Sequence, residues 1–188
     1  MSTDMSTVSP VRTRCPGGLV TAIRAATARH ADWAATAVLV ADELRQHLPG
    51  PDVLTAGELL GDPREYRTHV LHAEPDGSFS VAAMVWRPGQ ITPIHDHVTW
   101  CVFGVLQGIE YEELYAVSAD GRWMREVGAG QNLAGEVSGF APPGDIHRVR
   151  NLGDGVAVSL HVYGADITRL GSSVRRIYDL PVVPPAAR

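Results

Sequence analysis

The feature that most constrains the fold of this chain is a series of short β-type segments that begins after Tyr66. Apolar and β-branched residues are concentrated in these segments, and clusters of Gly, Pro and Asp separate them about every 8 to 12 residues. This spacing fits a β-barrel or a double-sheet jelly roll better than a βαβ fold. The sequence therefore predicts an all-β domain. The segments cover residues 69–73, 79–86, 99–108, 110–117, 122–127 and 156–164.

The N-terminal part of the chain has a different pattern. Residues 1–16 are polar and show no periodicity, so we expect a disordered leader. We expect residues 17–62 to form a helical segment that packs on a β domain of residues 63–188. With 188 residues, 45% of them hydrophobic, the chain can bury one sizeable core, which favours one domain. We expect a monomer or a small homo-oligomer.

Helical spacing of apolar residues between Leu19 and Leu48 predicts two helices, with a break near residues 30–32. We expect Trp33 and the alanine stripe of these helices to form the helix face that packs on the barrel. Thr55 and Glu58 have the spacing of a capping box, which predicts a short third helix that ends before Gly61.

Charge and composition argue against several classes of partner. The net charge is −5, and no run of Lys or Arg could follow a phosphate backbone or an anionic membrane, so we expect neither nucleic acid nor membrane as a partner. The chain has no apolar stretch of membrane-spanning length and no signal-peptide pattern at its start, which predicts a cytoplasmic protein. Cys15 and Cys101, the two cysteines, do not suggest a disulfide framework.

His95 and His97 are separated by one residue in the segment TPIHDHVTW. Side chains at positions i and i+2 of a strand project from the same face, so both imidazoles could reach one metal ion, while Asp96 points the other way. The alternative is a half-exposed strand with two ordinary histidines.

The surroundings of this pair resemble the two signature motifs of the cupin superfamily. The first motif is GQITPIHDHVTWCVFGVLQG, and the second, GFAPPGDIHRVRN, contains His147. The resemblance implies an all-β cupin fold, a jelly-roll β-barrel with short N-terminal α-helices here, in which His147 reaches the same metal from an adjacent strand. Where many cupins have a glutamate ligand, this chain has Cys101. Three neutral histidines suit Fe(II) oxygen chemistry, although imidazoles also bind Zn, Ni and Cu.

Ser159, His161 and Tyr163 lie at alternating positions of one predicted strand, so all three face one side. Together with three histidines and no carboxylate ligand, this row resembles the cysteine dioxygenase family, including its bacterial 3-mercaptopropionate dioxygenase relatives. The resemblance covers residues 66–178, about three-fifths of the chain.

The family resemblance implies Fe(II) as cofactor, bound by the three histidines, and a small thiol and O₂ as substrates. Both oxygen atoms would be added to sulfur to give a sulfinate. Tyr163 would place its hydroxyl near the substrate, held by His161 and Ser159. Some family members carry a thioether between a cysteine and a tyrosine, and Cys101 and Tyr163 are the corresponding candidates. A buried, unreactive Cys101 is the alternative.

The anchor for a substrate carboxylate departs from the family pattern. In the family it follows a tyrosine as Tyr-x-Arg or Tyr-x-Gln, and here the segment reads EYRTHVLHA. Alignment on Tyr66 puts Thr68 in the anchoring position and Arg67 one residue early, on the opposite face of an extended segment. A shift in register would turn Arg67 inward. The other candidates are Arg169, Arg87 and Arg176, and Trp100 is a candidate for the pocket wall.

Two other functions stay open from the sequence. One is a metal cupin that acts on a small molecule other than a thiol. The other is a non-catalytic, ligand-binding cupin with a regulatory role. The N-terminal helices lack the basic residues and the helix-turn-helix pattern that an output module for DNA binding would need.

Overall fold

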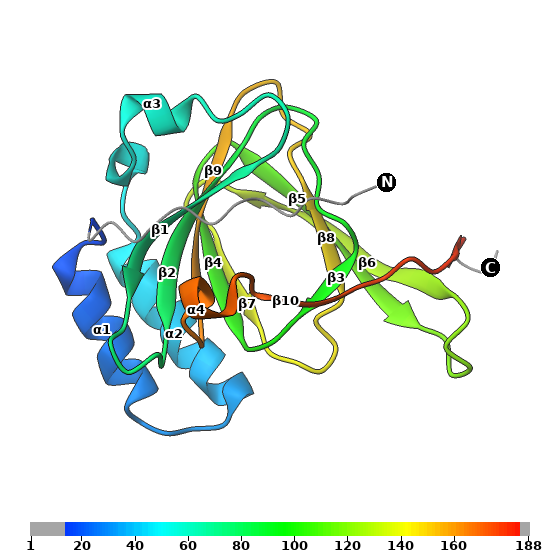
Figure 1. Cartoon of the computed structure of the whole chain (residues 1–188), viewed down its shortest axis with the longest axis horizontal. Coiled ribbons are helices and arrows are strands. Elements are labelled where there is room, and N and C mark those ends of the chain that lie inside the picture. Colours follow the sequence, from blue (N-terminus) through cyan, green and yellow to red (C-terminus); the bar gives the residue numbers. More distant parts are fainter. Residues whose placement is uncertain (1–13, 185–188) are drawn as a thin grey trace.

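The computed structural model describes residues 14–184, in which two β-sheets face each other and curl into a half-open barrel (Figure 1). This confirms the prediction of an all-β barrel with short N-terminal α-helices. The five-stranded sheet contains, in spatial order, β1 (Arg67–Ala73), β2 (Ser80–Trp86), β9 (Ala157–Tyr163), β4 (Cys101–Gln107) and β7 (Val137–Phe140). The six-stranded sheet contains β10 (Val174–Ile177), β3 (His95–His97), β8 (His147–Arg150), β5 (Ile109–Val117), β6 (Met124–Leu133) and β11 (Val182–Val183).

The helices α1, α2 and α3 lie where the sequence predicts them, whereas the turn η1 and the short helix α4 were not predicted. The chain forms α1 (Gly17–Thr27), α2 (Trp33–His47), the 3₁₀ turn η1 (Pro51–Val53), α3 (Ala56–Leu59) and α4 (Ile167–Leu170). The break between α1 and α2 includes His30, which has a φ of 51°. Thr55 and Glu58 form the predicted capping box of α3.

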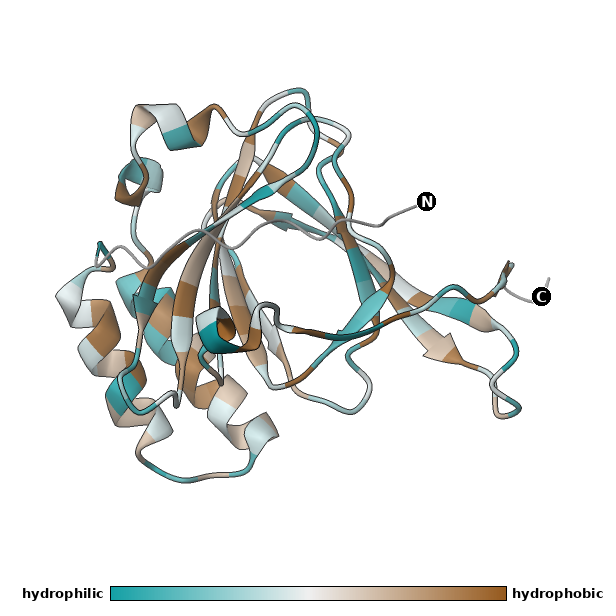
Figure 2. Ribbon diagram, viewed as in Figure 1, coloured by the Kyte–Doolittle hydropathy of each residue, from teal (hydrophilic) through white to brown (hydrophobic). Residues whose placement is uncertain are grey.

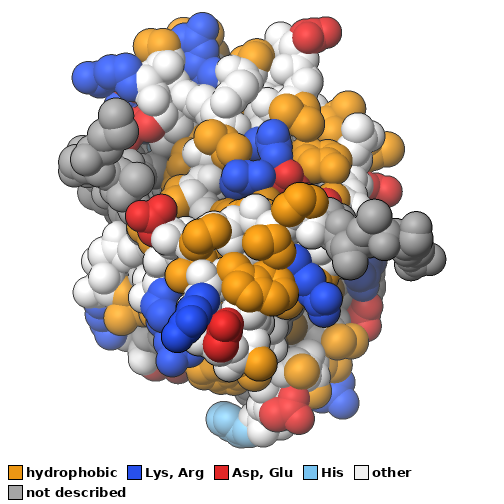
Figure 3. All heavy atoms as spheres, turned by 90° about the vertical axis from the view of Figure 1, so that its right-hand side faces the viewer, with side chains coloured by type: hydrophobic (Ala, Val, Ile, Leu, Met, Phe, Trp, Pro, Cys, Tyr) orange, Lys and Arg blue, Asp and Glu red, His pale blue; other side chains and the backbone are white. Residues whose placement is uncertain are grey.

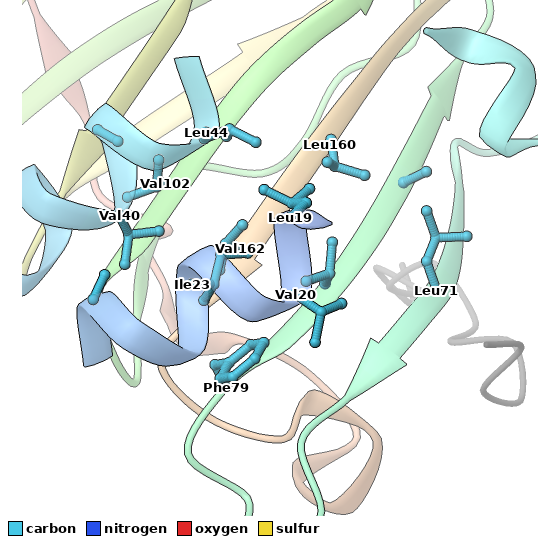
Figure 4. Close-up of a cluster of buried hydrophobic side chains, with 14 of the residues drawn as sticks. Leu19, Val20, Ile23, Val40, Leu44, Leu71, Phe79, Val102, Leu160 and Val162 are labelled. Atoms are coloured by element: carbon cyan, nitrogen blue, oxygen red, sulfur yellow. The ribbon is translucent and has the colours of Figure 1, made fainter. Parts of the chain in front are cut away.

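The main core lies between the N-terminal helices and the outer face of the five-stranded sheet. Leu19 and Ile23 of α1 and Val40 and Leu44 of α2 are buried there against apolar strand residues such as Leu160 (Figure 4). Figure 2 shows that hydrophobic and hydrophilic residues both occur along these helices, as expected for helices with one buried and one exposed face. This packing fixes the five-stranded sheet as one rigid wall of the barrel.

Trp33 does not belong to that core, contrary to the prediction. It is 48% exposed, because it is the first residue of α2 and the buried stripe of the helix begins about one turn later, at Thr36 and Ala37. The alanine part of the prediction is confirmed for Ala37 and Ala41, which are buried, but not for Ala34 and Ala35, which are exposed.

Alternate side chains of strand β9 point to the helix side of the sheet and into the barrel interior. Leu160 and Val162 belong to the core on the helix side, while Tyr163 packs with Cys101 in a separate cluster inside the barrel. All seven residues of the strand are buried, since one face meets the helices and the other faces the barrel interior. The antiparallel register of β4 and β9 sets Cys101 opposite Tyr163 and Phe103 opposite His161.

Trp100 lies in the core on the helix side, and it is not among the residues that line the cavity described below. The physical reason is alternation along the chain, because the next residue, Cys101, faces the barrel interior. Gly164 makes room for the indole, since a Cβ at this position would come within 2.2 Å of Trp100 Nε1.

Most of the predicted leader lies outside the described residues. At its end, the backbone N–H of Arg14 donates to the carbonyl oxygen of Leu71, and the Arg14 guanidinium forms two hydrogen bonds with Glu58. The described residues contain no helix that is long and apolar enough to cross a membrane. Figure 3 shows the face at the β6 and β11 end of the molecule, where apolar side chains lie between basic and acidic ones.

Candidate metal centre

Three buried histidines converge inside the barrel from two neighbouring strands. His95 and His97 come from β3, and His147 comes from β8, directly opposite His95 in the antiparallel register. One nitrogen of each ring lies within 4.8 Å of the others. The three side chains are at most 6% exposed, so a cation between them would be shielded from bulk water. Three buried imidazoles at this separation could hold one metal ion.

The Nδ1 atom of each ring has a partner outside the cluster. His147 Nδ1 lies 2.6 Å from Glu112 Oε1, His97 Nδ1 lies 3.2 Å from Asp145 Oδ2, and His95 Nδ1 lies 3.0 Å from the carbonyl oxygen of Pro93. Carbonyl and carboxylate oxygens accept hydrogen bonds, so each Nδ1 carries the ring hydrogen. Each Nε2 lone pair is then available to a metal, as the chemistry of a ligating histidine requires.

The charge state of the cluster fits a cation as well. Burial, followed by the proximity of the other two rings, holds the pKa of His95 well below its usual value. Burial also lowers the pKa of His97, although Asp145 opposes this shift. Neutral imidazoles are the form that binds metals, so protons compete weakly with a metal ion here.

Sequence reasoning missed Glu112 and Asp145. Asp145 precedes His147 by two residues in the second motif. Glu112 reaches His147 diagonally across the pairing of β5 and β8, which no local pattern reveals. Asp96 was expected to point away from the pair and it does, because it accepts hydrogen bonds from Arg176 and Tyr178.

Ser159, His161 and Tyr163 form a row of buried polar groups on β9. Ser159 Oγ lies 2.9 Å from His161 Nε2, and the Tyr163 hydroxyl lies 3.4 Å from His161 Nδ1. Burial lowers the pKa of His161 to about 3. Burial also raises the pKa of Tyr163 well above its usual value, so the phenol keeps its proton and can donate a hydrogen bond.

A cavity of about 60 Å³ connects the two groups of side chains. The histidine cluster and the pair His161 and Tyr163 both line it, and a stacked pair, Tyr66 and Trp86, forms another wall with ring centroids 4.3 Å apart. One water molecule needs about 10–15 Å³ of such space, so the cavity has room for a molecule of a few non-hydrogen atoms. The other lining residues are Thr68, Met84, Thr92, Phe140, Val149, Ile167, Ser172, Ser173 and Val174.

A family model for cysteine dioxygenase type I matches residues 60–171, which is more than half of the chain. The chain belongs to the cysteine dioxygenase family. Family membership indicates an oxidoreductase that acts on a thiol, and the three buried histidines are compatible with a metal cofactor.

Several solved cupin structures are also similar. The cupin domain of an XRE family transcriptional regulator from Enterobacter cloacae is 16% identical, with a TM-score of 0.40, covering 53% of this chain and 95% of that chain. A recombinant oxalate oxidase in complex with glycolate is 18% identical, with a TM-score of 0.44 and coverage of 55% and 53%. A Bacillus subtilis oxalate decarboxylase is 20% identical, with a TM-score of 0.44 and coverage of 56% and 27%.

The candidate crosslink of the cysteine dioxygenase family falls on two residues that pack together here. Cys101 and Tyr163 are both buried, and they belong to the same small apolar cluster. The Cys101 sulfur also lies 3.8 Å from His161 Nδ1. Burial raises the pKa of the Cys101 thiol well above its usual value, which favours the protonated form. A thioether between the two side chains stays a prediction.

The segment that carries the family's carboxylate anchor has Thr68 turned into the cavity and Arg67 turned away from it. Thr68 lines the cavity next to Tyr66, whereas Arg67 forms ion pairs with Asp62 and Glu65. The register shift that would bring Arg67 inward has not occurred.

The other candidate anchors also point elsewhere. Arg169 pairs with Asp166, and Arg176 pairs with Asp96. Arg87 lies against Gly61, where an added Cβ would contact its side chain. Among the described residues, those that line the cavity include no Lys or Arg. The sequence did not indicate that the segment around Ser172 and Ser173 forms part of the wall.

Proposed function

We propose that this protein is an Fe(II)-dependent dioxygenase that adds both atoms of O₂ to the sulfur of a small thiol, such as L-cysteine or 3-mercaptopropionate. The reaction RSH + O₂ → RSO₂H balances without an external reductant. The observation that carries this proposal is a cluster of three buried imidazoles on one side of a small cavity, with the Tyr163 hydroxyl on another side.

The neutral ligand set supports a thiol substrate. His95, His97 and His147 would hold the iron through Nε2 and add no negative charge. Iron, when bound, supplies the one-electron chemistry that lets O₂ react with sulfur. A thiol loses its proton more easily beside a divalent cation whose direct ligands are uncharged, so these ligands favour thiolate binding.

The residues of β9 would orient the reactants. The buried Tyr163 hydroxyl, which keeps its proton, can donate a hydrogen bond into the cavity or to His161. His161 and Ser159 lie behind it and restrict its position. The apolar walls around Tyr66, Trp86 and Met84 keep bulk water from the reacting sulfur.

The cavity wall offers hydroxyl groups, and not a cationic side chain, as partners for a substrate carboxylate. Tyr66, Thr68 and Ser173 all line it. Burial, together with the neighbouring Glu65, raises the pKa of Tyr66 to about 12, so its phenol is a donor at neutral pH. We expect these hydroxyl groups to bind the carboxylate of a substrate that carries one. The enzyme should then favour such thiols over thiols without a carboxylate less strongly than it would with a guanidinium in the cavity.

The test is oxygen consumption by the anaerobically Fe(II)-loaded protein with cysteine, 3-mercaptopropionate, mercaptosuccinate and cysteamine, with the products identified by mass. We expect at least one thiol to yield a sulfinate, and the His147→Ala variant and the Zn(II)-loaded protein to be inactive. Iron binding without turnover of any thiol would refute the proposed activity. It would favour a metal cupin that acts on another small molecule.

A matched pair of variants tests the anchor. Thr68→Val removes a hydroxyl from the cavity wall, so we expect KM to rise for thiols that carry a carboxylate more than for cysteamine. Arg67→Ala changes a side chain outside the cavity, so we expect KM to stay the same. The opposite pattern would mean that Arg67 turns inward when substrate binds.

A further inference from the structure

Glu110 on β5 is a carboxyl group buried inside the barrel with 1% exposure. Neither carboxyl oxygen meets hydrogen-bond geometry in the structure, yet the side chain lies close enough to Ser159 and Trp86 for hydrogen bonding to influence its pKa. Burial raises that pKa to about 7, and the nearby Ser159 and Trp86 side chains oppose the rise. A buried carboxyl is costly without donors, so its place beside a polar row indicates a role there.

The hydrogen bonds around Ser159 leave its hydroxyl hydrogen to be accounted for. Trp86 Nε1, which can only donate, lies 3.3 Å from Ser159 Oγ. His161 Nε2 lies 2.9 Å from the same oxygen. If both nitrogens donate, the oxygen's lone pairs are used and the Ser159 O–H needs an acceptor. Glu110 is the acceptor that lies beside it.

The far end of the row favours this direction. His161 Nδ1 faces the Tyr163 hydroxyl at 3.4 Å and the Cys101 sulfur at 3.8 Å. Burial keeps a proton on both of these groups, so both can donate to Nδ1. A neutral His161 that accepts at Nδ1 carries its hydrogen on Nε2 and donates it to Ser159.

We propose that Glu110 is a positioning residue that accepts the Ser159 hydroxyl hydrogen and so fixes His161 as the Nε2–H tautomer, whose Nδ1 accepts a hydrogen bond from Tyr163. The chain of donors then runs from Tyr163 through His161 and Ser159 to Glu110. Its consequence for catalysis rests on the proposed function, in which the Tyr163 hydroxyl faces the substrate. The tautomer itself does not depend on that function.

The opposite arrangement is available when the acceptor is missing. Ser159 would then donate to His161 Nε2, and Nδ1–H would donate to the Tyr163 oxygen. The Tyr163 hydroxyl hydrogen would turn to the sulfur of Met84, which lies 3.8 Å away. Glu110 thus determines whether the tyrosine hydrogen is held by His161 or released toward the cavity wall.

The experiment reads the His161 tautomer from ¹⁵N NMR of the metal-free protein, with the signal assigned by its loss in His161→Gln. We expect Nε2–H in the wild type, a shift to Nδ1–H in Glu110→Leu, and Nε2–H again in Glu110→Gln, because an amide oxygen can still accept from Ser159. An exposed residue, Glu126, serves as the control, and Glu126→Leu should change nothing. Nδ1–H in the wild type, or an unchanged tautomer in Glu110→Leu, would overturn the proposal.

Two further measurements separate positioning from folding. If Glu110→Leu does not fold, the tautomer is read in Ser159→Ala, which should lose the preference for Nε2–H. An unchanged tautomer in Ser159→Ala would contradict the proposed chain of hydrogen bonds. For the iron-loaded enzyme we expect kcat to fall roughly 10-fold in Glu110→Leu with KM unchanged, and no further fall when Ser159→Ala is already present. An inactive wild-type enzyme would refute the proposed function and leave the tautomer result standing.

Discussion

Glu112→Gln is the substitution that most directly tests how the histidine cluster is prepared for a metal. The Glu112 carboxylate lies 2.6 Å from His147 Nδ1, and both side chains are largely buried, at 15% and 6% exposure. The amide keeps the shape and an acceptor oxygen but removes the charge that makes the imidazole more basic. Loss of such an outer partner typically costs 10- to 100-fold in metal affinity. Because an acceptor remains, we expect the lower end, roughly 10-fold or about 1.4 kcal/mol.

The assay is anaerobic competition for Fe(II), and in parallel for Zn(II), against a coloured chelator. Glu113→Gln is the matched control, because this neighbouring glutamate pairs with Arg148 and Arg150. It should lower the melting temperature and leave the metal affinity unchanged. Equal losses of affinity in both variants would mean that the effect is general destabilisation. An unchanged affinity in Glu112→Gln would refute the reasoning that the carboxylate prepares His147.

Three other outcomes are expected. The pKa of His161 is about 3 when folded and about 6.5 when unfolded, so the unfolded state binds more protons between these values and stability must fall as the pH drops through this window. Urea unfolding of the metal-free protein should show this loss, of which His161 contributes on the order of 5 kcal/mol. His95 and His97 have lowered pKa values too, so His161→Gln should reduce the loss without abolishing it, and an equal loss in both proteins would contradict the burial argument. If Cys101 and Tyr163 are linked, intact mass after turnover should reveal a species lighter by two hydrogen atoms, and Cys101→Ala should lack it. A single unshifted mass would mean that Cys101 is an inert core residue. Leu44→Ala should cost about 3–5 kcal/mol in denaturant unfolding, since this side chain is fully buried between α2 and the sheet, and a cost below about 1 kcal/mol would mean that the helices are not firmly packed.

The β-strand pattern was predictable because it is local. Alternation placed Ser159, His161 and Tyr163 on one face of a strand, and the His-x-His spacing placed His95 and His97 together. The capping residues of α3 and the break before α2 were predictable for the same reason. Strand β6 runs to Leu133, beyond the predicted end at residue 127, because it pairs with β5 along its whole length and tolerates the glycines in between.

By itself the sequence determined the fold class, the three imidazoles and the polar row on β9, since each depends on short-range spacing or on a recognisable motif. Only the tertiary structure decided which side chains complete the site. The pairing of β5 with β8 brings Glu112 to His147, and barrel closure buries Glu110 beside Ser159. The orientation of β1 points Thr68 into the cavity and Arg67 away from it. These contacts join residues far apart in the chain, so their distances are set by how the sheets close and not by any pattern along the sequence.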